Sequence, residues 1–158
     1  MEKVSGDRNI ASYKPRKGES NDSNTNVFFE KLGLPPRGNA LYALLHKGFD
    51  YQVYKDLSKY LRIQKKEFNS LLDFAPATVD RRRLKGFTLG ESDVLYRLAE
   101  VSSAAIDLFE GDEDKARTWL KTPVKGIDNK RPVDMAITSA ETAAVIDLIG
   151  RLEYGVLS

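Results

Sequence analysis

The chain has 158 residues, of which 41% are hydrophobic, and its 25 basic and 23 acidic residues give a formal net charge of +2. This length allows one compact domain or two small ones, and the nearly balanced charge by itself indicates neither nucleic acid nor membrane as a partner. The lack of cysteine excludes disulfides and thiolate zinc sites, and no apolar run approaches the roughly 20 residues that a membrane-spanning helix needs. We therefore expect a soluble cytoplasmic protein with no signal peptide and no membrane segment.

The N-terminal residues 1–26 are predicted to be a disordered tail. They are rich in Ser, Asn, Asp, Gly and Lys, and they carry too little apolar surface to offset the entropy of ordering. The first structured part begins with the apolar residues Phe28, Phe29, Leu32 and Leu34. It is broken by Pro35 and Pro36 and continues in a helix that stops at Gly48.

The rest of the chain predicts an all-α fold. From Tyr51 almost to the end, apolar residues recur with a period close to 3.6, and the β-branched alternation typical of strands is missing. We expect one helix around residues 52–61, a second over residues 64–74, and a short third one that Pro76 opens and Gly86 ends.

Two capping boxes mark the later helices. Thr88 with Glu91 opens a long helix, and Thr138 with Glu141 opens the last one. Between them, Asp112 is expected to cap a short helix that is followed by a loop and a helical turn. The apolar stripe predicted for the long helix is Val94, Leu95, Leu98, Val101, Ala105 and Leu108. The stripe predicted for the last helix is Ala144, Val145, Leu148, Ile149 and Leu152.

Positive charge is concentrated within residues 62–86. Seven basic residues stand there against three acidic ones, although the whole chain is nearly neutral. The predicted order of two helices, a tight turn and a short basic helix is that of a helix-turn-helix, whose last helix enters the major groove of DNA. The basic residues are Arg62, Lys65, Lys66, Arg81, Arg82, Arg83 and Lys85.

Helical geometry separates the three consecutive arginines, because they fan over about 200° of the circumference. Thr78 and Arg82 share one face, whereas Val79 and Arg83 share another, and Val79 is the better candidate to pack inward. Arg83 is expected along the edge of the core. The alternative is a solvated basic helix that makes ordinary salt bridges. The predicted contacts with DNA bases or phosphates are Lys65, Lys66, Thr78, Arg81 and Arg82.

No arrangement of residues indicates catalysis. His46 is the only histidine, and no pair of carboxylates has the spacing of a metal site or of a general acid and base. A single histidine near a helix end is typical of a cap or a packing residue. Gly86 and Gly90 form no phosphate-binding pattern. We expect no catalytic residue, no metal and no cofactor.

Most of the chain resembles a known family, the Xre-type antitoxins that pair with RES-domain toxins. The resemblance covers roughly Leu57 to Val156, and it depends on the combination of paired arginines after Thr78, "ESDVLYRLAEV" and "DKARTWLKTP". The segment "PVDMAITSAETAAVIDLIGRLEYGV" resembles their C-terminal toxin-binding domain, also called the MbcA/ParS domain. The resemblance implies a phage-repressor-like helix-turn-helix of the Xre type, followed by a small helical domain.

The resemblance also implies a function. Such antitoxins occlude the active site of a cognate toxin that depletes NAD, and the pair usually represses its own promoter through operator DNA. The NAD chemistry would belong to the toxin. The family's arginine pair matches Arg82 and Arg83 or their neighbours, its helix start Glu91 and Ser92, its tryptophan Trp119, its prolines Pro123 and Pro132, and its closing segment Val145, Leu148, Arg151 and Gly155.

Two positions depart from the family pattern, because Asn129 and Glu141 stand where the family usually has glycine. Asparagine tolerates the left-handed backbone that glycine would adopt, so the first change is expected to be mild. Glu141 has a local role in the predicted capping box, but it leaves the backbone at the start of the last helix in doubt.

The C-terminal end is the predicted toxin-binding surface. After the last helix come two apolar residues with no helix left to bury them, so Tyr154, Val156 and Leu157 are candidates to anchor in a partner's cleft. Arg151 is the expected charged contact, and Trp119 is the remaining candidate. Trp119 and Tyr154 could instead be core aromatics.

The expected organisation is a tail over residues 1–26, a helical region with the helix-turn-helix over 27–100, and a toxin-binding domain over 101–158 that shares the long helix. We expect a homodimer through the helix-turn-helix region, with operator DNA and a RES-domain toxin as partners. Two alternatives remain open. One is a free-standing repressor without a toxin partner, and the other is a helix-turn-helix that serves only for dimerisation.

Overall fold

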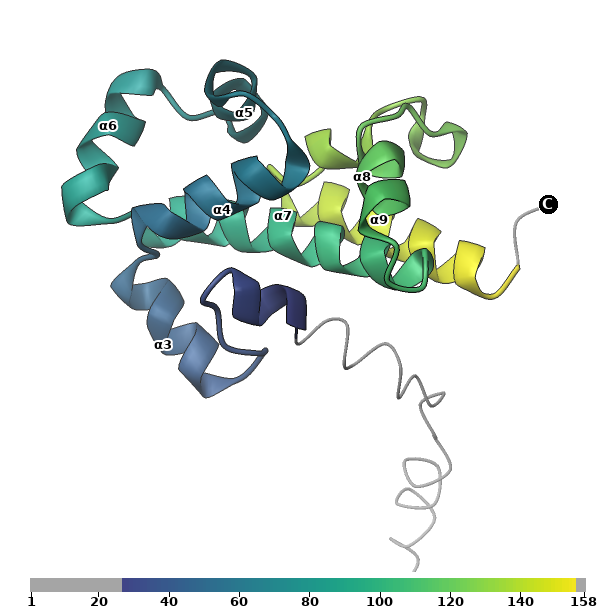
Figure 1. Cartoon of the computed structure of the whole chain (residues 1–158), viewed down its shortest axis with the longest axis horizontal. Coiled ribbons are helices and arrows are strands. Elements are labelled where there is room, and N and C mark those ends of the chain that lie inside the picture. The colour runs from purple at the N-terminus through teal and green to yellow at the C-terminus, as the bar shows by residue number, and fades with distance from the viewer. Residues whose placement is uncertain (1–26, 156–158) are drawn as a thin grey trace, which may run out of the picture.

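The computed structural model describes residues 27–155, and it is all-α there, which confirms the predicted fold class. A short helical segment over residues 27–31 comes first. The predicted tail over residues 1–26, and Val156 and Leu157, lie outside the described residues. The elements that follow are α3 (Asn39–Lys47), α4 (Tyr51–Leu61), α5 (Lys65–Leu72), α6 (Pro76–Lys85), α7 (Leu89–Leu108), α8 (Glu113–Leu120), the 3-10 turns η1 (Lys125–Ile127) and η2 (Pro132–Asp134), and α9 (Ser139–Glu153) (Figure 1).

Helix α7 is the axis of the molecule. Helices α3, α4, α8 and α9 pack against it, and Figure 1 shows it running through the middle of the molecule. Leu95, Leu98, Val101 and Ala105 of the predicted stripe are fully buried. Although α7 has 20 residues, neither it nor any other helix between residues 27 and 155 is long and apolar enough to cross a membrane. The predicted domain boundary at residue 100 falls inside α7, so both predicted parts are built on one helix.

Three helices begin at the predicted capping residues. At α7 the box is complete, since Thr88 Oγ1 accepts from the Glu91 N–H at 3.2 Å and the Glu91 carboxylate accepts from the Thr88 N–H at 2.9 Å. Asp112 caps α8 through its carboxylate. At α9 only half of the box forms, because the Glu141 carboxylate accepts from the Thr138 hydroxyl instead of the backbone N–H. Each cap satisfies backbone donors of the first turn and is worth about 1 kcal/mol.

Both departures from the family pattern fit locally. Asn129 adopts φ 60°, so it takes the left-handed backbone without glycine, as predicted. Glu141 lies in regular helix, since α9 begins at Ser139. The prediction that Ala144 belongs to the apolar stripe of α9 is wrong, because Ala144 is exposed. Thr142, about 200° away around the helix, is buried instead. The residues that α9 buries are Thr142, Val145, Leu148 and Ile149.

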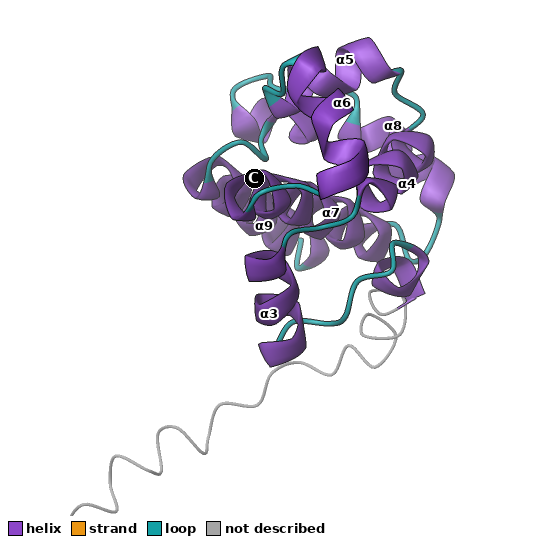
Figure 2. Cartoon of the chain, turned by 90° about the vertical axis from the view of Figure 1, so that its left-hand side faces the viewer, coloured by secondary structure: helices purple, strands orange, loops and turns teal. Residues whose placement is uncertain are grey.

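Helices α5 and α6 form the predicted helix-turn-helix and pack on α4 (Figures 1 and 2). Asp73 closes the turn between them with φ 58°, and Pro76 occupies the first turn of α6. Helix α6 ends at Gly86, as predicted. Val79 is fully buried, which confirms that this face of α6 points inward.

The loop between α3 and α4 and the loop after α6 are tied to each other. The Phe87 N–H donates to Phe49 O at 2.9 Å, and the Phe49 N–H donates to Ser92 Oγ at 2.8 Å. Gly48 has φ 100°, and a Cβ added there would lie 2.0 Å from Phe87 O. Only glycine fits this close approach of two backbones.

Replacement of Gly48 by alanine is expected to lower the free energy of unfolding by about 2 kcal/mol or more, because strained backbone and a backbone clash combine. Urea unfolding of the full chain measures this. Gly90→Ala is the matched control, since no heavy atom of the described residues lies near its added Cβ. That variant is expected to be as stable as the wild type or more stable by about 0.5–1 kcal/mol. A Gly48→Ala variant of wild-type stability would contradict the close approach.

Candidate functional site

The candidate residues lie at two opposite ends of the molecule. The helix-turn-helix occupies one end, the ends of α8 and α9 occupy the other, and α7 runs between them (Figure 1). The first end carries Lys65, Lys66, Thr78, Arg81 and Arg82. The second end carries Trp119, Arg151 and Tyr154, whereas Val156 and Leu157 lie outside the described residues.

The three arginines of α6 have three different environments. Arg81 is exposed and donates only a long hydrogen bond, of 3.4 Å, to Thr78 Oγ1. Arg83 places its guanidinium carbon 5.3 Å from the centroid of the Tyr51 ring, at the edge of the core. Arg82 is only 19% exposed. The three side chains are therefore not one basic patch.

Arg82 forms a two-point ion pair with Glu91 at the start of α7. Its Nε donates to Oε1 at 2.7 Å and its Nη2 to Oε2 at 3.2 Å. Burial by itself would raise the pKa of Glu91, but the hydrogen bonds from Arg82 and Thr88 outweigh burial and lower that pKa below its ordinary value. One carboxylate thus caps α7 and anchors α6. The sequence singled out Arg82 as a DNA contact, and the structure directs its guanidinium to Glu91.

The two lysines begin α5. Unpaired backbone N–H groups and the helix dipole favour an anion at this end of a helix. Lys65 lies 3.4 Å from a carboxylate oxygen of Asp80, in an exposed pair that contributes little energy but places the start of α5 beside α6. Lys66 is exposed, and Thr78 is half-buried in the first turn of α6. Together with Arg81, these residues can contact a phosphate backbone.

A second basic group, on α4, was not predicted. A groove of about 570 Å³ beside the start of α5 is lined in part by Lys55, Lys59, Arg62 and Lys65. Lys55 and Lys59 are four residues apart, and Arg62 follows three residues later. This spacing places the three side chains on one face of the helix. This spacing is visible in the sequence, so helical periodicity applied to charged residues would have found the group.

Trp119 lies on the outer side of α8. It is half-buried, and its ring is tilted against Phe109 with a centroid distance of 6.4 Å. These two rings line a shallow, largely apolar hollow of about 480 Å³ together with Lys115, Thr118 and Thr122. Trp119 is therefore neither a buried core residue nor a fully exposed one, and its outer side can receive an apolar group.

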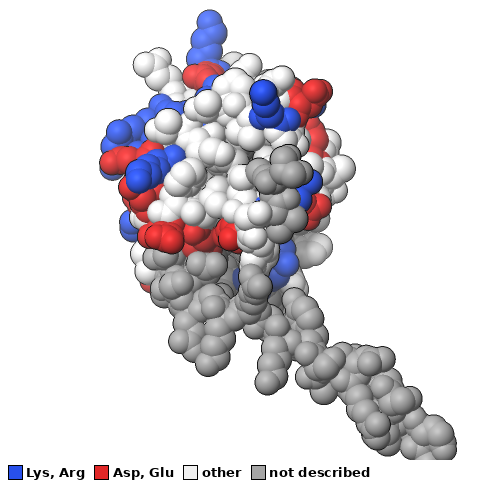
Figure 3. Space-filling model, turned by 90° about the vertical axis from the view of Figure 1, so that its right-hand side faces the viewer, with Lys and Arg blue, Asp and Glu red and all other residues white. Residues whose placement is uncertain are grey.

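Arg151 and Tyr154 lie exposed at the end of α9, where Tyr154 is 55% exposed. They line a small hollow with Ile146, Asp147 and Gly150. Figure 3 shows this end of the molecule: uncharged residues form the centre of the face, and charged residues gather toward its edges. Such a surface suits a protein partner better than a nucleic acid.

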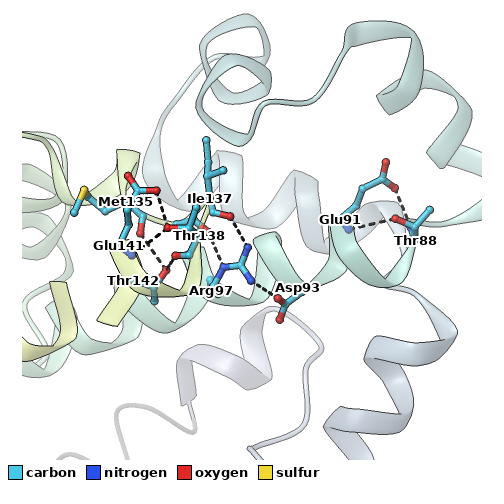
Figure 4. Close-up of polar contacts among 10 residues, drawn as sticks. Thr88, Glu91, Asp93, Arg97, Met135, Ile137, Thr138, Glu141 and Thr142 are labelled. Carbon is cyan, nitrogen blue, oxygen red and sulfur yellow. Dashed lines mark hydrogen bonds and ion pairs between the residues drawn. The ribbon is translucent and has the colours of Figure 1, made fainter. Parts of the chain in front are cut away.

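Arg97 fixes the start of α9 against α7, a contact that was not predicted. Its Nε donates to Ala136 O at 2.8 Å, its Nη2 donates to Ile137 O at 2.7 Å, and its Nη1 pairs with Asp93 (Figure 4). Thr142 Oγ1 also donates a hydrogen bond to Met135 O at 3.0 Å. The position of α9 is thus set by hydrogen bonds to backbone oxygens as well as by its apolar stripe.

Three cations of the C-terminal part hold the helix-turn-helix region. Arg117 Nε donates to Tyr60 O at 2.6 Å, and Lys121 Nζ donates to Leu61 O at 2.9 Å, so α8 caps the end of α4. Arg131 Nη1 pairs with Glu67 Oε1 of α5 at 3.1 Å. The inner side of α8 therefore binds α4, whereas its outer side carries Trp119.

The described residues offer no constellation for catalysis. No group of three or more His, Asp or Glu side chains between residues 27 and 155 could hold a metal ion. His46 is exposed in the last turn of α3.

The chain is similar to known proteins. Residues 104–155 match the family described as the antitoxin Xre/MbcA/ParS C-terminal toxin-binding domain. A protein named Antitoxin Xre from Yersinia enterocolitica serotype O:8 / biotype 1B is 36% identical over 137 residues, which are 85% of this chain and 93% of that protein. Another of the same name, from Photorhabdus laumondii subsp. laumondii, is 31% identical with the same coverage.

Replacement of Arg82 by glutamine is expected to lower the unfolding temperature at pH 7, because Glu91 loses its ion-pair partner. The folded-state pKa of Glu91 is below its ordinary value, so the pair stabilises the fold above the ordinary carboxylate range. That contribution is lost as the pH falls through the folded-state pKa. The difference between variant and wild type is therefore expected to shrink below about pH 4.

Arg81→Gln is the matched control, because Arg81 is exposed and makes only a long hydrogen bond. Its unfolding temperature is expected to equal that of the wild type at pH 7 and at low pH. A loss of stability in Arg82→Gln that is the same at both pH values would show that the pair with Glu91 is not its cause.

Proposed function

The chain belongs to the family of Xre antitoxins, and we propose that it neutralises a cognate RES-domain toxin and represses its own operon by binding operator DNA. The match of residues 104–155 to a toxin-binding domain carries the first part of this proposal. That segment runs from the second half of α7 to the end of α9, and it contains the largely uncharged end of the molecule in Figure 3.

The proposed toxin surface combines α8 and α9. Trp119 offers a half-buried ring beside Phe109, and Arg151 and Tyr154 offer a charge and an exposed ring at the end of α9. Aromatic and arginine side chains of this kind dominate the energy of many interfaces. Val156 and Leu157, which follow in the sequence, are further candidates for this contact.

The proposed mechanism is steric. The antitoxin occludes the NAD-binding cleft of the toxin with the end of its chain near the mouth of that cleft, and the chemistry belongs to the toxin. The antitoxin itself needs neither a catalytic group nor a cofactor for this role. Exposed apolar and arginine side chains at the end of α9 support such a plug.

At the other end, we propose that the helix-turn-helix binds the operator. Lys65, Lys66, Thr78 and Arg81 lie at the start of α5 and on α6, and the start of α5 adds a helix dipole favourable to phosphate. For Arg82 we propose a positioning role, because its pair with Glu91 holds α6 against α7. The basic groove along α4 adds charge for further backbone contacts.

A homodimer through the helix-turn-helix region is part of the proposal. Leu84, near the end of α6, is 96% exposed, which is unusual for a leucine on an otherwise charged helix. A second copy would cover it, and a two-fold dimer would present two α6 helices to two half-sites of an operator.

Lys66→Ala and Arg81→Ala are each expected to flatten the log–log dependence of DNA affinity on salt concentration by about 0.9, because each removes one phosphate contact. A gel-shift salt titration with the duplex upstream of the reading frame measures the slope. Lys125→Ala, an exposed change in the other half of the chain, is the matched control and should keep the wild-type slope. Unchanged slopes in both test variants would remove the DNA role of these residues.

The double variant Arg151→Glu, Tyr154→Ala is expected to weaken toxin binding at least about tenfold, because it reverses the charge and removes the ring at the end of α9. Calorimetry with the toxin of the adjacent reading frame and rescue of growth on coexpression measure it. Lys66→Ala should bind the toxin as the wild type does. Full neutralisation by the double variant would place the toxin surface elsewhere, and DNA binding without any toxin complex would favour the free-standing repressor.

A further inference from the structure

A groove with a volume of about 790 Å³ lies between α7 and α9. Its third wall comes from the segment before α3, which contributes Phe29, Pro36 and Arg37. Arg37 ties this segment to α7 through a hydrogen-bonded ion pair with Glu100 at 2.8 Å. Residues outside the matched toxin-binding segment therefore help to shape a groove on it.

Most of the side chains that α9 contributes to the groove are small or apolar, and Asp107 of α7 and Asp147 of α9 also line it. Ser103 and Thr142 are buried at its bottom, Ala104 and Ile146 are half-buried, and Ala143 is exposed. Small side chains on two neighbouring helices leave room for the backbone of a third element. The groove can thus accept a helix or an extended segment.

The charge in the groove is uneven. At the end near the start of α9, Arg97 pairs with Asp93, and Arg37 pairs with Glu100. At the other end, Asp147 is exposed and makes no ion pair with any residue between 27 and 155. A cation on the occupant would complement it.

The groove continues into the proposed toxin surface. Ile146 and Asp147 line the groove, and they also line the hollow that contains Arg151 and Tyr154. One side of α9 is therefore a continuous surface from the groove to the end of the helix.

We propose that a segment of the toxin lies in this groove, with small or apolar side chains against Ala143 and Ile146 and a cationic side chain at Asp147. This inference rests on the proposed function, because it assumes that residues 104–155 bind a toxin. Continuity with the end of α9 and the acidic charge favour the toxin as occupant. A second copy is disfavoured as occupant, because a two-fold contact through this face would bring two identical acidic grooves together.

The test compares two adjacent alanines of α9. Ala143→Arg fills the groove with a long side chain at a position that lines it, and both arginines stand within one turn of Asp147, so the two variants differ in the filling of the groove. Ala144→Arg introduces the same side chain at the next position, which is exposed and does not line the groove. With the purified toxin of the adjacent reading frame, Ala143→Arg is expected to weaken binding at least about tenfold, and Ala144→Arg to leave it unchanged. Equal unfolding temperatures of the two full-length variants exclude misfolding as the cause.

The outcomes separate the inference from the proposed function. If the wild type binds no toxin, the proposed function fails. If both alanine variants bind like the wild type while the Arg151→Glu, Tyr154→Ala variant does not, the function stands and the groove inference is overturned. Hydrogen exchange tests the remaining occupant: faster exchange over residues 139–150 after deletion of residues 1–26 would show that the chain's own N-terminal segment fills the groove, which also overturns it.

Discussion

The burial of α7 by helices from both halves of the chain is the constraint on which the rest of the structure depends. Leu95, Leu98 and Val101 of α7 are fully buried. Helices α3 and α4 from the first half of the chain and α8 and α9 from the second half therefore pack against the same helix. A continuous helix of 20 residues is about 30 Å long, and it keeps the two ends of the molecule apart. The helix-turn-helix and the partner surface are therefore two ends of one packed unit, because the core between them is shared.

Helix α8 contributes side chains to contacts at both ends of the molecule. Trp119 faces the apolar hollow on its outer side, whereas Arg117 and Lys121 hold the end of α4 from its inner side. The same helix thus contributes to the proposed toxin surface and to the position of the helices that carry the basic residues. On the other side of the molecule, Glu91 caps α7 and anchors α6 through Arg82, so α6 is held to α7 by a charged contact and by the buried Val79. Charged contacts and buried apolar side chains, among them Phe68 and Val79, therefore both orient the basic helices.

The local part of this architecture could be predicted from the sequence. Helix boundaries follow from periodicity, from Pro76, and from the caps at Thr88 and Asp112, because these signals act within a single turn. The contacts that orient whole helices could not be predicted. Arg97 reaches backbone oxygens 39 and 40 residues away, and no local pattern encodes an acceptor that every residue possesses. The same limit applies to Arg82. Helical periodicity predicts its position on α6, but no local pattern predicts that its partner, Glu91, lies on α7.

The hydrogen bonds from the second half of the chain to the first half end mainly on backbone oxygens. Arg117 and Lys121 reach the main chain at the last two residues of α4, so the side chains at those positions contribute nothing to these bonds. The hydrogen bonds of this joint therefore tolerate substitution at the end of α4, whereas its packing does not, because the Arg117 guanidinium carbon lies 5.0 Å from the centroid of the Tyr60 ring and Leu61 is fully buried. The attachment of the two halves thus depends on where α4 ends and on the two large side chains that end it.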